Sequence, residues 1–168
     1  MRKGEKGILA LTVVITVLFA GINVYRQDQD KEPDKGIPFY TTASKELQSE
    51  GAALMNTLEC RDCHMLWGLR NPMQSVPAPW LDGIGSLRDE AWFYNYLSAE
   101  DPQSILPSRL KAEYKMPSYA GLPENERRTL AAYLANLKVE EWYLPEVRKI
   151  EYEKLTGQDY KSETEGAP

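Results

Sequence analysis

The chain of 168 residues is long enough for one domain with additional segments, and its 42% hydrophobic residues can form a buried core. Its formal net charge of −5 argues against nucleic acid as a partner, because nucleic-acid-binding proteins present a basic surface. The sequence contains no Gly-rich phosphate loop and no serine-based catalytic constellation.

Residues 1–26 have the pattern of a single transmembrane anchor. Arg2, Lys3 and Lys6 precede an uncharged stretch from Ile8 to Val24. As a helix, these roughly 17 residues rise about 25 Å, and the residues that follow can reach the membrane interface. The positive-inside rule then predicts a bacterial cytoplasmic-membrane protein, single-pass, with the remaining chain on the periplasmic (outer) side. A cleavable signal peptide is the alternative, although no clear cleavage site follows.

Residues 27–40 are rich in charge, Pro and Gly, and this composition predicts a linker. The globular domain is expected over residues 41–138. It begins with a helix whose apolar positions follow helical spacing, and the small residue Gly51 on that face would let another helix approach closely. A tolerated mid-helix glycine is the other interpretation of Gly51.

The sequence Cys60-Arg61-Asp62-Cys63-His64 contains the chain's only cysteines and its only histidine. A C-x-x-C-H sequence is typical of c-type haem attachment, with two thioether bonds from the cysteines and ligation of iron by the histidine. A redox dithiol has no use for the following histidine. A structural zinc site needs four ligands, and this turn offers three at most. One covalently attached haem c is therefore the expected cofactor.

After a proline-rich segment, Ser86 and Asp89 predict the start of a second helix by a variant of the capping box. Pro123 suits the first turn of the last core helix. Residues 139–168 form an extension, predicted to be helical from Pro145 to about Leu155 and disordered from Gly157. Two roles stay open for the extension: packing against its own domain, or docking on a neighbouring subunit.

These features resemble the class I c-type cytochromes over about residues 41–138. The resemblance rests on Gly51 in the first helix, the haem motif, Met116-Pro117, and a last helix with Ala132-Tyr133-Leu134. It implies an all-α class I cytochrome c fold, here preceded by a single N-terminal transmembrane helix. It also implies that the stretch from Ala78 to Gly85 is the family's proline loop, and that this loop, which contains Pro79, holds the ligating histidine through a backbone carbonyl.

Two methionines are candidates for the second axial ligand beside His64. Met116 precedes Pro117, which holds the backbone extended, and it lies about 50 residues from the histidine. Met73 is the alternative. Both this separation and the family pattern favour Met116, so His64 and Met116 are the predicted metal ligands. An open distal position is the remaining interpretation.

The predicted function is electron transfer rather than catalysis. Ligation by histidine and methionine leaves no iron position for a small-molecule substrate, and no second histidine is available for acid–base chemistry. A haem enzyme or gas sensor with a labile distal ligand is the alternative. The layout is similar to the small subunit of nitric oxide reductase and to membrane-tethered cytochromes that feed terminal oxidases. It implies a subunit or tethered relay of a respiratory or photosynthetic complex, with the membrane and other redox proteins as partners.

Overall fold

The computed structural model describes the backbone of residues 3–29, 35–73 and 76–161, and the side chains of these residues except 3, 5, 6, 8–10 and 26–29. The chain divides into two compact units, Met1–Ile37 and Pro38–Pro168.

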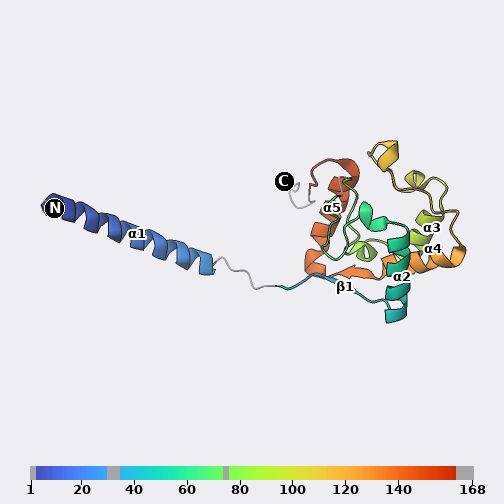
Figure 1. Ribbon diagram of the computed structural model, residues 1–168, viewed down its shortest axis with the longest axis horizontal. Coiled ribbons are helices and arrows are strands. Elements are labelled where there is room, and N and C mark those ends of the chain that lie inside the picture. The colour runs from blue at the N-terminus through green and yellow to red at the C-terminus, as the bar shows by residue number, and fades with distance from the viewer. Residues whose placement is uncertain (1–2, 30–34, 74–75, 162–168) are drawn as a thin grey trace, which may run out of the picture. The chain divides into compact units, whose positions relative to one another are not determined.

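In the described residues of the first unit, the helix α1 runs from Lys3 to Gln29 (Figure 1). Its described stretch from Leu11 to Tyr25 is exposed and is apolar in large part. Searched over the described part of the chain, no helix has the length and apolar character needed to cross a membrane.

Two predictions for the N-terminus are corrected on this finding. The single-pass anchor over residues 1–26 is not supported, and neither is the location at the bacterial cytoplasmic membrane that followed from it. The side chains of residues 8–10, where the predicted anchor begins, lie outside the described residues. The predicted linker over 27–40 also differs from the structure, because α1 continues to Gln29 and a strand begins at Phe39.

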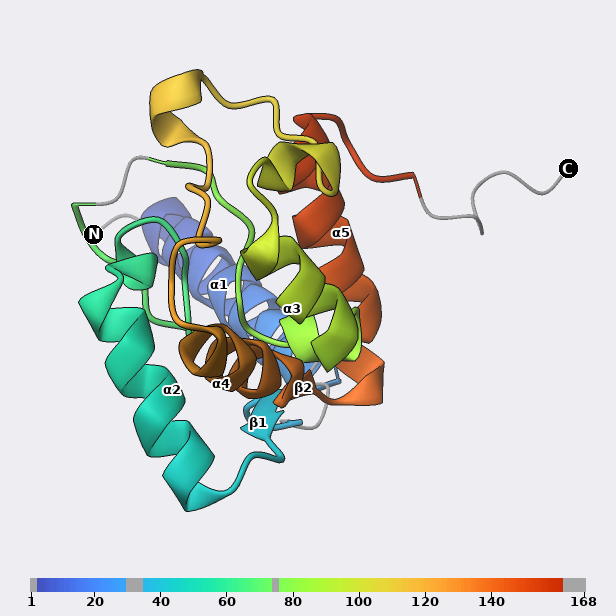
Figure 2. The ribbon, with the colours of Figure 1, turned by 90° about the vertical axis from the view of Figure 1, so that its right-hand side faces the viewer.

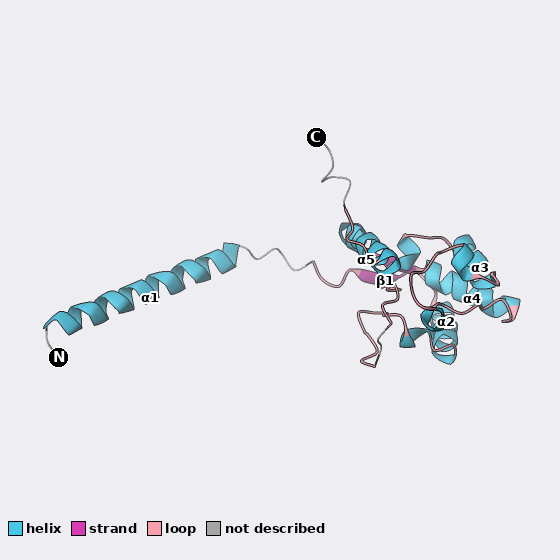
Figure 3. Ribbon diagram, turned by 90° about the horizontal axis from the view of Figure 1, so that it is seen from above, coloured by secondary structure: helices cyan, strands magenta, loops and turns pink. Residues whose placement is uncertain are grey.

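The second unit combines four α-helices with a small antiparallel sheet (Figures 1 and 3). Its elements are β1 (Phe39–Thr41), α2 (Lys45–Thr57), α3 (Glu90–Ser98), α4 (Glu124–Ala135), β2 (Leu137–Val139) and α5 (Leu144–Thr156). The prediction of an all-α class I cytochrome c fold with a transmembrane helix before it is therefore wrong. The prediction missed the two-stranded sheet, which pairs residues at the two ends of the predicted haem domain.

The sheet joins segments that are far apart in the chain. Phe39 pairs with Val139, and Thr41 pairs with Leu137. Leu137 and Val139 are buried and alternate with the partly exposed Lys138, which is the period of a strand with one buried face. The backbone bond from Thr42 N to Asn136 O, 3.1 Å long, extends the pairing to the end of α4.

Helix α4 packs on both α2 and α3, as Figure 2 shows. Its apolar residues recur at helical spacing and are buried on the face toward these two helices. The buried residues of this face are Leu130, Ala131, Tyr133, Leu134 and Ala135. The hydrophobic core of the second unit is therefore centred on α4.

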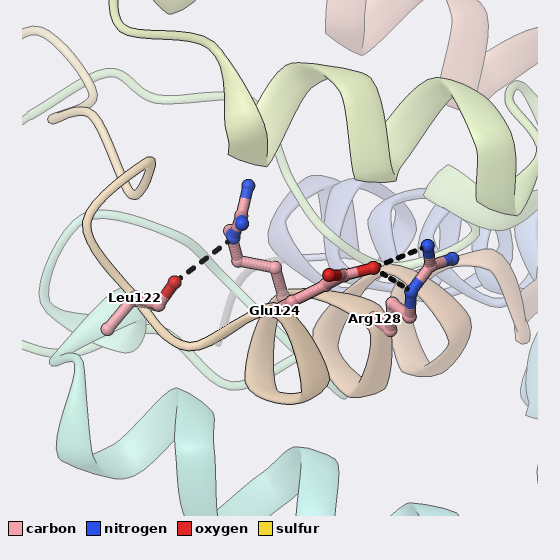
Figure 4. A network of polar contacts seen from close by, with 4 residues as sticks. Leu122, Glu124 and Arg128 are labelled. Carbon is pink, nitrogen blue, oxygen red and sulfur yellow. Dashed lines mark hydrogen bonds and ion pairs between the residues drawn. The ribbon is translucent and has the colours of Figure 1, made fainter.

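Polar contacts hold the start of α4 (Figure 4). Arg127 Nε donates to the Leu122 carbonyl at 3.2 Å, and Arg128 donates to Glu124 one turn earlier on the helix. Both guanidinium groups also lie over the ring of Tyr94 on α3, at 5.6 Å and 4.5 Å from the ring centroid. These cation–π contacts connect the exposed edges of α3 and α4.

Helix α3 begins three residues later than the capping pattern predicts. Asp89 is its N-cap, and the Asp89 carboxylate accepts a 2.8 Å hydrogen bond from Trp92 N. Ser86 instead lies in a short 3-10 turn, where its hydroxyl accepts from Val139 N at 3.1 Å. The Ser86 side chain, which was expected to cap α3, therefore contacts β2 instead.

The extension packs against its own domain. Val147 of α5 is buried, and the ring of Tyr143 meets Phe39 of β1 edge to face. Glu151 of α5 forms an ion pair with Arg88, and both side chains are largely shielded from solvent. Of the two roles left open by the sequence, the structure therefore shows the first. Residues 162–168 of the predicted disordered end lie outside the described residues.

Candidate functional site

The cysteine–histidine motif follows helix α2 and forms one tight turn. The helix starts at Ser44, whose hydroxyl accepts from Leu47 N at 3.2 Å. It ends just before Glu59, whose φ of +54° reverses the chain. The next residues form a short helical turn, in which His64 N donates to Cys60 O at 3.0 Å. Cys60, Cys63 and His64 are thereby held on a single turn.

This turn forms one wall of an apolar cavity of about 320 Å³. The other walls come from α2, the proline loop, α3, the segment between α3 and α4, α4 itself and α5. Its apolar lining includes Met55, Leu81, Ile84, Phe93, Leu97, Leu106, Leu130, Leu134 and Leu155. Cys60, Cys63, His64, Pro79 and Met116 line the same cavity, so all five predicted site residues are brought together.

His64 is oriented by the backbone of the proline loop. Its Nδ1 lies 2.7 Å from the Pro79 carbonyl oxygen. A carbonyl only accepts, so Nδ1 carries the proton and Nε2 keeps a lone pair for a ligand. Burial lowers the pKa of His64, and the bond to Pro79 opposes this shift only in part. The ring is therefore neutral at neutral pH, which is the form that ligates metals.

The two candidate methionines occupy different environments. Met116 is partly buried, packs against the core and lines the cavity. Met73 is 88% exposed and is not among the residues of the cavity wall. Of these two methionines, only Met116 lies at the wall of the cavity, where it could contact a group bound there.

Tyr119 connects the Met116 loop with Cys60. Its hydroxyl makes a hydrogen bond with the Cys60 side chain, and burial together with Cys60 raises the pKa of Tyr119 to about 12. Burial also raises the pKa of both thiols, Cys60 and Cys63. A reactive dithiol uses a lowered pKa instead, so the environment of these cysteines is unlike that of a redox-active pair.

The loop after His64 is held by a buried carboxylate that the sequence analysis did not single out. Leu66 and Leu69 exchange two backbone hydrogen bonds around a two-residue turn, in which Trp67 and Gly68 both have positive φ. The Asp82 carboxylate accepts from the backbone N–H of both turn residues. Asp82 is only 2% exposed. The sequence feature that could have indicated this role is a lone acidic residue between apolar neighbours, in Leu81-Asp82-Gly83.

The sequence analysis also missed the contribution of α5 to the cavity. Glu151 and Leu155 of α5 line it together with Arg88 and Trp92 of the α3 region. The Arg88 guanidinium lies 4.5 Å from the centroid of the Trp92 ring as well as beside Glu151. No local pattern in residues 139–168 indicates that this helix faces a cavity, since the contact joins elements more than 60 residues apart.

Among the described residues, no cluster of three or more His, Cys, Asp or Glu side chains is arranged to hold a metal ion. Comparison of the chain with protein-family models, with curated proteins and with solved structures finds no match.

Proposed function

We propose that this protein transfers electrons and holds one haem c, attached through Cys60 and Cys63 and ligated by His64 and Met116. The observation that carries the proposal is the 2.7 Å bond from His64 Nδ1 to the Pro79 carbonyl, on a cavity that both cysteines and Met116 also line. A metal-ligating histidine characteristically donates its other ring N–H to such an acceptor, which fixes its tautomer and orientation.

The cavity suits a large, flat, mostly apolar group. Its volume of about 320 Å³ falls within the range of cofactor sites, and its walls are chiefly aliphatic and aromatic. Arg88 lies at the cavity wall paired with Glu151, and its remaining guanidinium N–H groups would suit the carboxylate groups that haem carries. The two cysteines of this turn have two residues between them, which is the spacing that thioether attachment requires.

The chain's own groups would set the properties of the site. His64 offers a neutral imidazole nitrogen, Met116 offers a thioether, and the apolar walls exclude water. When bound, haem supplies an iron centre that gains and loses a single electron. A thioether ligand raises the reduction potential relative to a second histidine. With His64 and Met116 both holding the group, the site would favour exchange of electrons with other redox proteins over binding of a small-molecule substrate.

Covalent attachment is tested by denaturing the protein expressed with a haem c maturation system. Haem should stay on the wild-type chain through acid–organic extraction. It should be lost from the Cys60→Ser/Cys63→Ser double variant, and each single variant should keep one thioether bond. Haem that washes out of the wild-type chain would refute the proposal.

Axial ligation is tested by absorption spectroscopy of the oxidised protein. The weak sulfur-to-iron charge-transfer band of methionine ligation should be present in the wild type and absent from Met116→Ala. Met73→Ala is the matched control, because Met73 is exposed and lies off the cavity wall. Loss of the band in Met73→Ala, with its retention in Met116→Ala, would reassign the ligand.

A further inference from the structure

The loop that carries Met116 is tied to the corner that follows α3 by two side chains. Gln103 Nε2 donates to the Met116 carbonyl at 3.3 Å. Ser118 Oγ donates to the Ala99 carbonyl at 2.7 Å. The two bonds are made by the residues on either side of Pro117. Met116, which precedes this proline, is held by Gln103, and Ser118, which follows it, is held by Ala99.

Gln103 is itself firmly placed. It belongs to a short 3-10 turn, Pro102–Ser104, which begins with the buried Pro102. The Asp101 carboxylate caps this turn by accepting from Gln103 N at 3.1 Å. Gln103 also lines the cavity, so its side chain runs along the wall to reach Met116.

The orientation of the Gln103 amide follows from its surroundings. The Met116 carbonyl accepts hydrogen bonds only, so the NH₂ group must face it. The opposite atom, Gln103 Oε1, is buried, and no described protein group donates to it. Reversing the amide would set two oxygens against each other. The side chain therefore has one favourable orientation, in which it holds the Met116 backbone.

We infer that Gln103 is a positioning residue for Met116, which keeps the Met116 thioether at the cavity wall and limits its departure from iron. The inference rests on the proposed function, since it presupposes that Met116 is the axial ligand. Gln103 acts through the backbone of Met116 and does not itself ligate. Removing its N–H donor leaves the Met116 carbonyl unpaired and makes opening of the loop easier.

Imidazole measures this opening directly, because it binds the oxidised iron only where Met116 has left. We expect Gln103→Leu to bind imidazole about fivefold more tightly than the wild type, the factor that one ordinary hydrogen bond contributes. Gln103→Asn, whose amide is shorter by one methylene group, should act in the same direction. Ser104→Ala is the matched control: Ser104 lies in the same turn and bonds to the Asp101 carbonyl, not to the Met116 loop.

The same change made in a Met116→Ala background separates a positioning role from a merely structural one. With the thioether absent, Gln103→Leu should leave imidazole affinity unchanged, because the two sites act through one interaction. An equal gain in both backgrounds, or no gain in the wild-type background for either Gln103 variant, would overturn the inference while leaving the proposed function intact. If Met116→Ala alone changes neither the sulfur-to-iron band nor the affinity for imidazole, the proposed ligation is wrong and the inference falls with it.

Discussion

Gly51 of α2 lies against the ring of Tyr133 of α4. A Cβ atom added to Gly51 would stand 2.3 Å from Tyr133 Cγ and 2.6 Å from Tyr133 Cβ, well inside van der Waals contact. Tyr133 cannot move away easily, because it is 3% exposed and packed in the core. The close approach of the two helices therefore depends on glycine at this position, and a merely tolerated glycine is excluded.

We expect Gly51→Ala to destabilise the second unit. At so short a distance the cost of overpacking lies in the upper part of its usual range, about 2–3 kcal/mol. Alanine gains about 1 kcal/mol in helix propensity, so the net loss should be about 1–2 kcal/mol. Urea unfolding followed by circular dichroism measures it. Gly121→Ala is the control, since nothing lies within 4 Å of its added Cβ. Equal unfolding free energies for Gly51→Ala and the wild type would show that the helices separate freely.

The buried carboxylate of Asp82 should be needed for the loop after His64. Asp82→Ala removes the acceptor of the N–H groups of Trp67 and Gly68, and a hydrogen bond to a charged group contributes about 1.5–3 kcal/mol to stability. We expect a loss of that size in the free energy of unfolding, together with faster proteolysis within residues 65–73. The exposed Asp159→Ala is the control. Unchanged proteolysis would mean that the turn keeps its shape without the carboxylate.

The pH dependence of stability should reveal the burial of the same group. Burial raises the pKa of Asp82 above its ordinary value of 3.8, and the bonds from Gly68 and Trp67 oppose this only in part. The folded state therefore holds the proton more tightly than the unfolded state. Stability associated with the protonated form is fully present below pH 3.8 and is lost as pH rises through the folded pKa.

Asp82→Asn cannot ionise, so it serves as the reference for that pH effect. The difference in unfolding free energy, wild type minus Asp82→Asn, should fall as pH rises from below 3.8 toward neutrality and stay constant above this window. Unfolding in urea at a series of pH values gives this difference. A difference that increases with pH would mean that the hydrogen bonds outweigh burial and that the direction of the pKa shift is wrong.

Helix α5 should contribute to the stability of the domain. Val147 is 4% exposed and packs close to Gly83, so Val147→Ala removes two buried methyl groups and should cost about 1–3 kcal/mol. Because α5 also lines the cavity, a chain that ends after Lys138 should lose the folded cavity altogether. Thermal unfolding tests both, with the exposed Lys149→Ala as control. A stably folded truncated chain would show that the extension is dispensable.

The parts of this fold that were predictable are those with local signals. The helix that carries Gly51, the turn from Cys60 to His64 and the last core helix follow from periodicity and from a compact motif. The expectation for Met116 rested on the following proline and on the family resemblance. In each case the informative residues lie within a few positions of one another, or match a known pattern.

The parts that were missed depend on pairs distant in sequence. A strand of three residues is too short for its alternation of apolar and polar side chains to be recognised in the sequence. Nothing near Phe39 in the sequence indicates that it pairs with Val139. The same holds for Arg88 with Glu151 and for Gln103 with Met116. At residues 1–26 composition alone suggested a bilayer span, and the helix found there does not meet that requirement over its described side chains.

The pairing of β1 with β2 also has a kinetic consequence. It closes a loop of roughly 100 residues, so its contacts join residues far apart in the sequence. These contacts stabilise the fold only after the chain has lost the conformational entropy that closing the loop costs. The turn after α2, by contrast, involves only neighbouring residues. We therefore expect the cysteine-bearing turn to form early, while the sheet and the wall that α5 contributes to the cavity form late. During that interval both thiols, which stay only half-buried in the folded structure, would be more accessible to an enzyme that attaches the proposed haem.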